Sequence, residues 1–246
     1  MCVRSAAELA AVRRLASRGE PTAAIARRLG IPRSTVRGWL SPTARTPQPP
    51  RVANLAAVPP EAYAYLLGLY LGDGHVVSTG RSYRLTIKLD AAYPGIVEEA
   101  AAAVGAVMPG HAVAVRPHPT QRCVSVSTHS ILWPRLLPQH GPGRKHTRPI
   151  RLTPWQLAIT RAEPRALVRG LIHSDGSRYV AVVRRRGRMY RYTRYSFANR
   201  SDDIKAIFCE HLDRLGIRWT RPNEKDIAVA RKADVALMDA FIGPKT

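Results

Sequence analysis

The chain has 246 residues, enough for one or two domains that bury a hydrophobic core without disulfide staples. It carries 39 Lys and Arg against 17 Asp and Glu, a formal charge of +22, which predicts a polyanionic partner. A hydrophobic content of 45% excludes a charge-driven disordered tail. Three widely spaced cysteines form no zinc or redox pair, and neither a membrane span nor a signal core is visible. We therefore expect a cytoplasmic, nucleoid-associated bacterial protein with no membrane partner.

Residues 1–41 are predicted to form three short helices over 6–18, 22–29 and 34–40. Gly19 and Gly30 end the first two helices, Pro32 blocks continuation, and Ser34 is expected to cap the third. Residues 25–36, IARRLGIPRSTV, resemble the helix-turn-helix of resolvase-type recombinases and many regulators. The resemblance implies DNA contacts from the outer face of the third helix, and the alternative is a packing domain without a ligand. The predicted contacts are Arg33, Ser34, Thr35 and Arg37.

Residues 42–60 are predicted to be a linker, because their prolines remove backbone donors and fix φ. Beyond this linker the chain contains an approximate duplication. Residues 65–74 read YLLGLYLGDG and residues 167–176 read LVRGLIHSDG, so that Asp73 and Asp175 lie 102 positions apart. Each copy continues with two predicted strands, a helix, two further strands and a final helix.

Small residues recur at a spacing of four in both repeated segments. Gly68 and Gly72 share one helical face, as do Gly170 and Ser174, although glycine inside a helix costs roughly 1 kcal/mol against alanine. We therefore expect the two helices to pack closely about a pseudo-twofold axis, which brings their ends together. Each helix ends in Asp-Gly, and a carboxylate there opposes the helix dipole. Two apposed carboxylates are reasonable if they bind divalent cations such as Mg²⁺ beside substrate phosphates.

The two copies resemble the LAGLIDADG motifs of homing endonucleases in their single-chain form, over roughly residues 61–246. Phe197-Ala198-Asn199-Arg200-Ser201 also fits a pattern that often follows the second motif, with Ser201 as a natural N-cap. The resemblance implies an α+β protein: an N-terminal three-helix helix-turn-helix and a pseudo-twofold core of two αββαββα halves with saddle-shaped antiparallel sheets. The halves are assigned to residues 61–145 and 166–246, with an inter-half connection over 146–165.

The resemblance also implies the chemistry of the site. The predicted catalytic residues are Asp73, Asp175, Lys145 and Lys245, and the predicted metal site comprises Asp73, Asp175, Gly72 and Ser174. The cofactor would be Mg²⁺ or another divalent cation such as Mn²⁺. The expected partner is double-stranded DNA, bound by a monomer without an obligate protein partner.

A basic segment over residues 184–195 is predicted to straddle a hairpin with Gly187 near its turn. Alternate side chains of a ribbon share a face, so arginines could reach phosphates or guanine edges and tyrosines could stack. The alternative is a solvated, charge-rich hairpin. The predicted contacts of the core are Arg84, Lys88, Arg184, Arg185, Arg186, Arg188, Tyr190, Arg191, Tyr192 and Arg194.

The leading hypothesis is a site-specific, metal-dependent endonuclease for double-stranded DNA. The often acidic sixth motif position is Leu71 in the first copy and His173 in the second, and the polar residue expected near the end of the second strand falls near Ala91. Some relatives with a helix-turn-helix keep this fold without cleavage. The main alternative is therefore a DNA-binding transcription regulator with an inactive core, and a third is an RNA-binding or splicing cofactor.

Overall fold

The computed structural model describes residues 6–41 and 57–243. The chain forms two compact units, which divide between Ala53 and Asn54, and each is described by itself. The predicted linker lies mostly in residues 42–56, outside the described residues. No helix within the described ranges is long and apolar enough to cross a membrane.

The first unit contains three helices around a small apolar cluster. They are α1 (Ala6–Ser17), α2 (Thr22–Leu29) and α3 (Arg33–Trp39). Gly30 ends α2 with a left-handed φ of 63°, as its position after the helix predicts. The expected cap by Ser34 is wrong: α3 begins one residue earlier, directly after Pro32, and no side chain caps it. The cluster consists of Val12, Leu15, Ile25, Ile31 and Val36.

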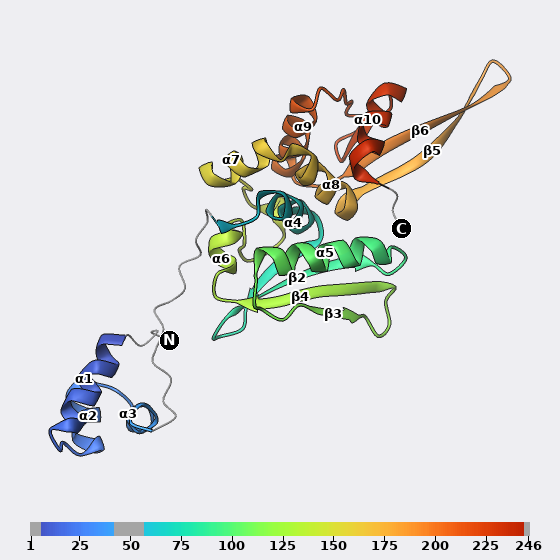
Figure 1. Ribbon diagram of the computed structural model, residues 1–246. Coiled ribbons are helices and arrows are strands. Elements are labelled where there is room, and N and C mark those ends of the chain that lie inside the picture. The colour runs from blue at the N-terminus through green and yellow to red at the C-terminus, as the bar shows by residue number, and fades with distance from the viewer. Residues whose placement is uncertain (1–5, 42–56, 244–246) are drawn as a thin grey trace. The chain divides into compact units, whose positions relative to one another are not determined.

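The first half of the second unit begins with a helix that is buried on all sides, followed by a four-stranded antiparallel sheet of order β1-β2-β4-β3. Helix α5 packs against this sheet (Figure 1). The elements are α4 (Pro60–Asp73), β1 (Gly74–Ser78), β2 (Tyr83–Asp90), α5 (Pro94–Val107), β3 (Ala114–Pro117), β4 (Cys123–Ser130) and α6 (Trp133–Leu136).

The connection between the halves contains a short helical turn, η2 (Lys145–Thr147), and a helix that the sequence analysis missed, α7 (Pro154–Ala162). The second half then comprises α8 (Pro164–Asp175), β5 (Gly176–Arg185), β6 (Arg188–Ala198), α9 (Asp202–Arg214), β7 (Asp226–Val229) and α10 (Lys232–Ile242). Its sheet has the order β5-β6-β7. The prediction of two strands after α9 is wrong in this half, because the first of them is reduced to an isolated antiparallel bridge from Thr220 to Ala228. As predicted, Ser201 caps α9 by accepting a hydrogen bond from the Ile204 amide at 3.3 Å.

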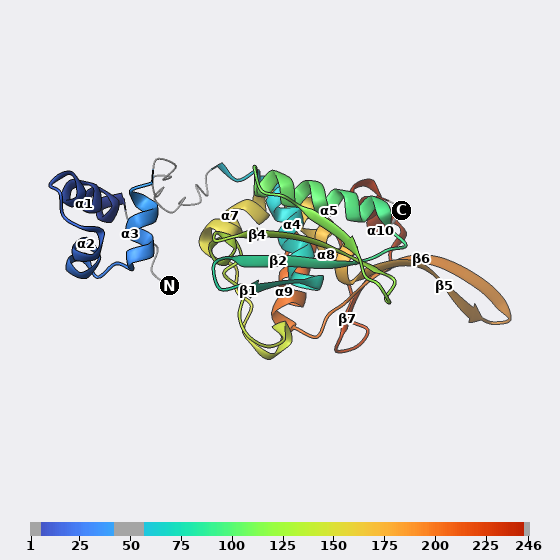
Figure 2. The same cartoon turned by 90° about the horizontal axis from the view of Figure 1, so that it is seen from below.

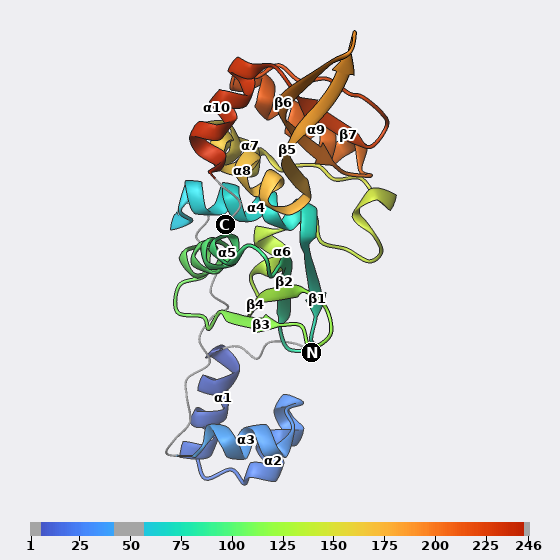
Figure 3. The ribbon, with the colours of Figure 1, turned by 90° about the vertical axis from the view of Figure 1, so that its right-hand side faces the viewer.

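Helices α4 and α8 pack against each other between the two sheets (Figures 1 and 3). A Cβ on Gly68 would lie 2.5 Å from the Leu167 carbonyl oxygen, and a Cβ on Gly170 would overlap the Tyr65 carbonyl oxygen. The predicted close approach at these glycines is confirmed. The two halves with their paired helices and antiparallel sheets, together with the three-helix unit, confirm the predicted fold class.

Candidate metal and nucleic-acid site

The close helix packing brings the C-terminal ends of α4 and α8 together. Asp73 is the last residue of α4 and Asp175 the last of α8. A Cβ on Gly72 would overlap the Ser174 hydroxyl and lie 3.1 Å from Oδ2 of Asp175, so the Asp175 carboxylate lies against the last turn of α4. Four of the predicted site residues, Gly72, Asp73, Ser174 and Asp175, therefore belong to one neighbourhood.

Lys145 joins this neighbourhood from the connection between the halves. Its ammonium donates to the carbonyl oxygens of Tyr70, Gly72 (2.6 Å) and Gly74 (2.9 Å) at the end of α4. Burial lowers the pKa of Lys145 to about 8, although Asp175 and Asp73 act in the opposite direction. A tethered positive charge thus offsets the two carboxylates and the negative end of the α4 dipole.

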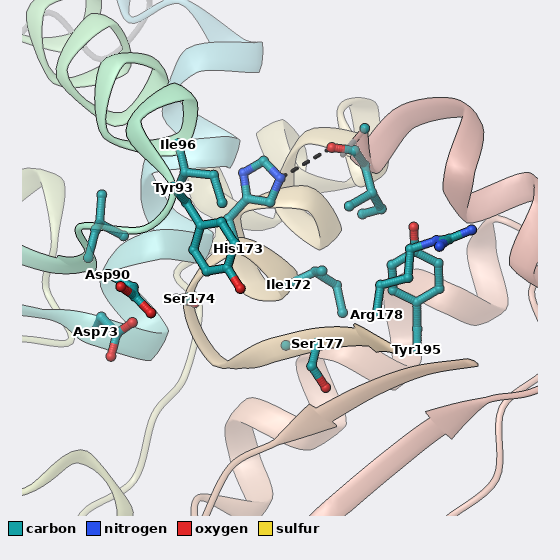
Figure 4. A pocket seen from close by; sticks show the side chains of 14 residues that line it. Asp73, Asp90, Tyr93, Ile96, Ile172, His173, Ser174, Ser177, Arg178 and Tyr195 are labelled. Atoms are coloured by element: carbon teal, nitrogen blue, oxygen red, sulfur yellow. Dashed lines mark hydrogen bonds between the residues drawn. The ribbon is translucent and has the colours of Figure 1, made fainter. Parts of the chain in front are cut away.

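Two polar residues that the sequence analysis did not place in the site lie beside the carboxylates. Asn199 follows β6 and donates from Nδ2 to Oδ2 of Asp175 at 2.6 Å. Asp90 ends β2 and lines a cavity with Asp73 (Figure 4), one position before the residue to which the resemblance pointed. The signal was available in the sequence, because both residues stand where the second strand of their half ends.

The His173 side chain connects three helices through hydrogen bonds that do not reach the Asp73 or Asp175 carboxylates. Its side chain is buried, and its Nδ1 lies 2.9 Å from the Tyr65 hydroxyl of α4. Its Nε2 lies 3.2 Å from the Ile242 carbonyl oxygen, the contact drawn in Figure 4. The histidine that replaces an acid at the sixth motif position therefore ties α8 to α4 and α10.

The oxygen donors fit a hard divalent cation only if the substrate completes the coordination. Among the described residues no group of three or more His, Cys, Asp or Glu could hold a metal ion. The Ser174 hydroxyl donates to Gly170 and Leu171 carbonyls of its own helix, at 3.0 Å each. Mg²⁺ is commonly held by one or two carboxylates with waters and substrate phosphates, and the Asp73 and Asp175 carboxylates match that pattern.

The open face of the first sheet carries basic side chains. Arg84 and Lys88 are exposed on β2, and Arg84 pairs with Val77 in register. His75 lies between them and the helix ends: burial, then the charges of Lys88, Arg84 and Lys145, lower its pKa. The side of the strands with Val76, Leu85 and Ile87 is buried, so the basic residues face away from the core.

Strands β5 and β6 extend beyond their sheet as a two-stranded ribbon (Figures 1 and 2). Arg186 and Gly187 form its turn with φ values of 50° and 76°, close to the predicted position. The register puts residues on two faces, because directly paired residues point the same way. The open face carries Tyr179, Arg188, Tyr190, Tyr192 and Arg194, and the helix-side face carries Val180, Val182, Arg184, Met189 and Arg191.

The predicted ribbon contacts are therefore divided. The rings of Tyr190 and Tyr192 stack at 6.2 Å with an angle of 10°, in agreement with a shared face. Tyr195 lies four residues beyond Arg191 and so shares its face. It is buried and donates to Asp239 of α10 at 2.6 Å, which identifies this face as the helix-side face. Arg184 and Arg191 share that face rather than the tyrosine face. These contacts remain predictions.

The other predicted residues are placed as follows. Arg33, Ser34 and Arg37 are exposed on α3, and Thr35 is half-buried. They belong to the first unit, separate from the core. Lys245 lies outside the described residues, as does the side chain of Arg185.

The architecture and the site define a class: a two-half α+β core with aspartates at the ends of its paired helices, in a chain that also carries a three-helix unit. Residues 3–41 match the family model described as a homeodomain-like domain. No curated protein matches the sequence.

The solved structures that are similar to this chain include a homing endonuclease, a LAGLIDADG meganuclease and the protein DUF199/WhiA. I-DmoI, in complex with DNA and Mn, is 14% identical with a TM-score of 0.49, covering 76% of this chain and 99% of that chain. The LAGLIDADG meganuclease I-AabMI, bound to uncleaved DNA, is 11% identical with a TM-score of 0.46, covering 73% and 83%. DUF199/WhiA from Thermatoga maritima is 14% identical with a TM-score of 0.48, covering 78% of this chain and 59% of that chain.

Proposed function

We propose that the chain binds double-stranded DNA and hydrolyses its phosphodiester bonds with a divalent cation, Mg²⁺ or Mn²⁺, at the Asp73–Asp175 site. The observation that carries the proposal is the approach of the Asp175 carboxylate to the last turn of α4, whose final residue is Asp73. Carboxylates at two apposed helix ends are electrostatically unfavourable unless cations neutralise them. The basic open faces and the charge of +22 support a polyanionic substrate.

In this proposal the residues divide the work of binding and chemistry. A bound divalent cation would activate water and neutralise charge on the phosphate. Asp73 and Asp175 hold that cation, and Asn199 orients the Asp175 carboxylate through its 2.6 Å hydrogen bond. Lys145 already uses three ammonium donors on the carbonyls of Tyr70, Gly72 and Gly74, so it fixes the end of α4 instead of touching DNA directly.

The test is cleavage of a duplex that the full chain selects from a random DNA library. Breaks that require Mg²⁺, and that cease when EDTA is added, are the expected result. Intact duplex under conditions in which the protein is fully bound would contradict the hydrolysis.

A second candidate function is DNA binding without cleavage, as in a transcription regulator. It is favoured by the hydrogen bonds that already occupy the site: the Gly72 carbonyl accepts from Lys145, and the Asp175 carboxylate accepts from Asn199. Selective binding of one duplex with no breaks, and unchanged affinity in Asp73→Asn, would support this alternative. Preference for structured RNA over duplex DNA at fixed salt would instead indicate an RNA-binding function.

A further inference from the structure

A cavity of about 280 Å³ lies on the β1 side of the α4 terminus, next to the candidate site but lined differently. Tyr70 and Gly74 at the end of α4 line it, together with residues between 140 and 148. Its basic lining residues are His75, His140, Arg144, Lys145 and Arg148, and no Asp or Glu lines it. The guanidinium groups of Arg144 and Arg148 make this hollow positive, while the Lys145 ammonium beside them interacts electrostatically with Asp175 and Asp73.

The donors of this cavity are only partly used by the protein. Arg148 donates from one terminal nitrogen to the Gln139 carbonyl, while its buried Nε has no hydrogen-bond partner among the described atoms. Arg144 is exposed at the rim. His140 is half-buried, and its ring meets that of Tyr83 edge-on at 5.9 Å. An arrangement of cationic donors with incomplete partners favours an anion that accepts several hydrogen bonds.

We propose that this basic cavity is a phosphate-binding site that takes one backbone phosphate of the DNA strand passing over the first half. The inference rests on the DNA binding proposed above and adds a named contact to it. Gly74 lines the cavity and directly follows Asp73, so the bound phosphate would lie beside the Asp73 carboxylate. His75, which Arg84, Lys88 and Lys145 influence electrostatically, connects the cavity with the basic open face of the sheet.

The second half has different residues at the matching position. Ser177 stands two residues after Asp175, where His75 stands two residues after Asp73. The next residue, Arg178, is bound by Asp239 through Nε at 2.8 Å and a terminal nitrogen at 2.9 Å. Among the described residues, the phosphate contact is therefore assigned to the first half.

The test compares the wild-type full chain with Arg144→Glu, His140→Ala and the matched control Arg165→Glu. Arg165 is exposed on the first turn of α8, about 15 Å along the helix from Asp175, beside Glu61 and Glu163. For a duplex selected from a random library, the slope of log affinity against log salt should fall in magnitude by about 0.9 in Arg144→Glu. Arg165→Glu should leave the slope unchanged.

Single methylphosphonate substitutions then locate the phosphate. One position, on one strand, should weaken binding to the wild type and have no further effect on Arg144→Glu or His140→Ala. Equal responses of Arg144→Glu and Arg165→Glu, or no position whose effect disappears in the cavity variants, would overturn the inference even though DNA binding persists.

A second arm uses inorganic phosphate without DNA, followed by ³¹P line broadening. Binding by the wild type that is lost in Arg144→Glu supports the phosphate chemistry of the cavity. If the wild type binds inorganic phosphate but binds no duplex DNA, the cavity is a site for free phosphate. That result would support the phosphate-binding cavity and contradict the proposed function. Binding of neither probe overturns both.

Discussion

The ends of α4 and α8 have the same backbone arrangement but different side-chain surroundings. Asp73 is exposed, shares a cavity with Asp90, and lies beside the Lys145 ammonium that binds the α4 carbonyls. Asp175 is half-buried and held by Asn199. Helix packing therefore fixes where the two helix ends lie, while residues from outside the motifs set the surroundings of each carboxylate.

Replacing either aspartate by asparagine should have the largest effect. Asp73→Asn and Asp175→Asn should each lower Mg²⁺-dependent cleavage by about a thousandfold or more, because each removes an oxygen donor to the cation. The measurement is the rate of nicking of each strand of the selected duplex.

The same variants should differ in stability. Asp175→Asn should lower the free energy of unfolding by about 1 kcal/mol more than Asp73→Asn, because it weakens a charge-assisted bond from Asn199. Denaturant titration measures this difference. Equal losses in the two variants would mean that the ends of α4 and α8 are energetically equivalent after all.

A side chain added at the interface between α4 and α8 should disturb the close packing on which both helix ends depend. Gly170→Ala should destabilise the core by at least about 2 kcal/mol, because the new Cβ would overlap the Tyr65 carbonyl oxygen. The matched control is Gly105→Ala on α5, whose Cβ would lie 3.9 Å from Val113 Cγ2. This control should gain up to about 1 kcal/mol from helix propensity. A similar response of both variants in urea denaturation would contradict the close packing.

The lysine should give the first half a distinctive pH dependence. Burial lowers the pKa of Lys145 to about 8 from the ordinary lysine value of 10.5, so between these pH values the unfolded chain binds more protons than the folded chain. Folding stability should therefore rise with pH across this window, by about 3 kcal/mol in total from this group. Lys145→Met should remove this rise in denaturant titrations from pH 7 to 11. An unchanged slope in the variant would assign the titration to other groups.

The smallest predicted effect is a difference in the salt dependence of DNA binding between the two faces of the β5–β6 ribbon. Arg188→Ala on the tyrosine face should reduce the magnitude of the salt slope of DNA binding by about 0.9, the loss of one phosphate contact. Arg191→Ala removes the same charge from the helix-side face and serves as the control. Affinity measured at several salt concentrations checks this, and a larger effect of Arg191→Ala would show that DNA approaches the other face.

Features encoded by local sequence could be predicted. The glycine spacing gave the helix crossing, Ser201 gave a cap, and the two Asp-Gly pairs gave the ends of α4 and α8. Each signal consists of residues a few positions apart, although the crossing that the glycine spacing predicts joins Gly68 to Leu167 of the other half.

Features that depend on long-range register could not be predicted. Only the packing of Tyr195 against Asp239 of α10 shows which face of the ribbon is the helix-side face. Only tertiary packing brings Lys145 to carbonyls of residues more than 70 positions earlier. Two local signals were also misread, because Ser34 does not cap α3 and helix α7 was missed although Thr153 and Gln156 form a capping box there.

Manganese binding by the protein–DNA complex tests the central claim most directly. Electron paramagnetic resonance titration of Mn²⁺ into the wild-type complex should reveal bound cation that Asp73→Asn and Asp175→Asn each diminish, while both variants keep the duplex. Equal Mn²⁺ uptake by wild type and both variants would show that these carboxylates do not form a cation site.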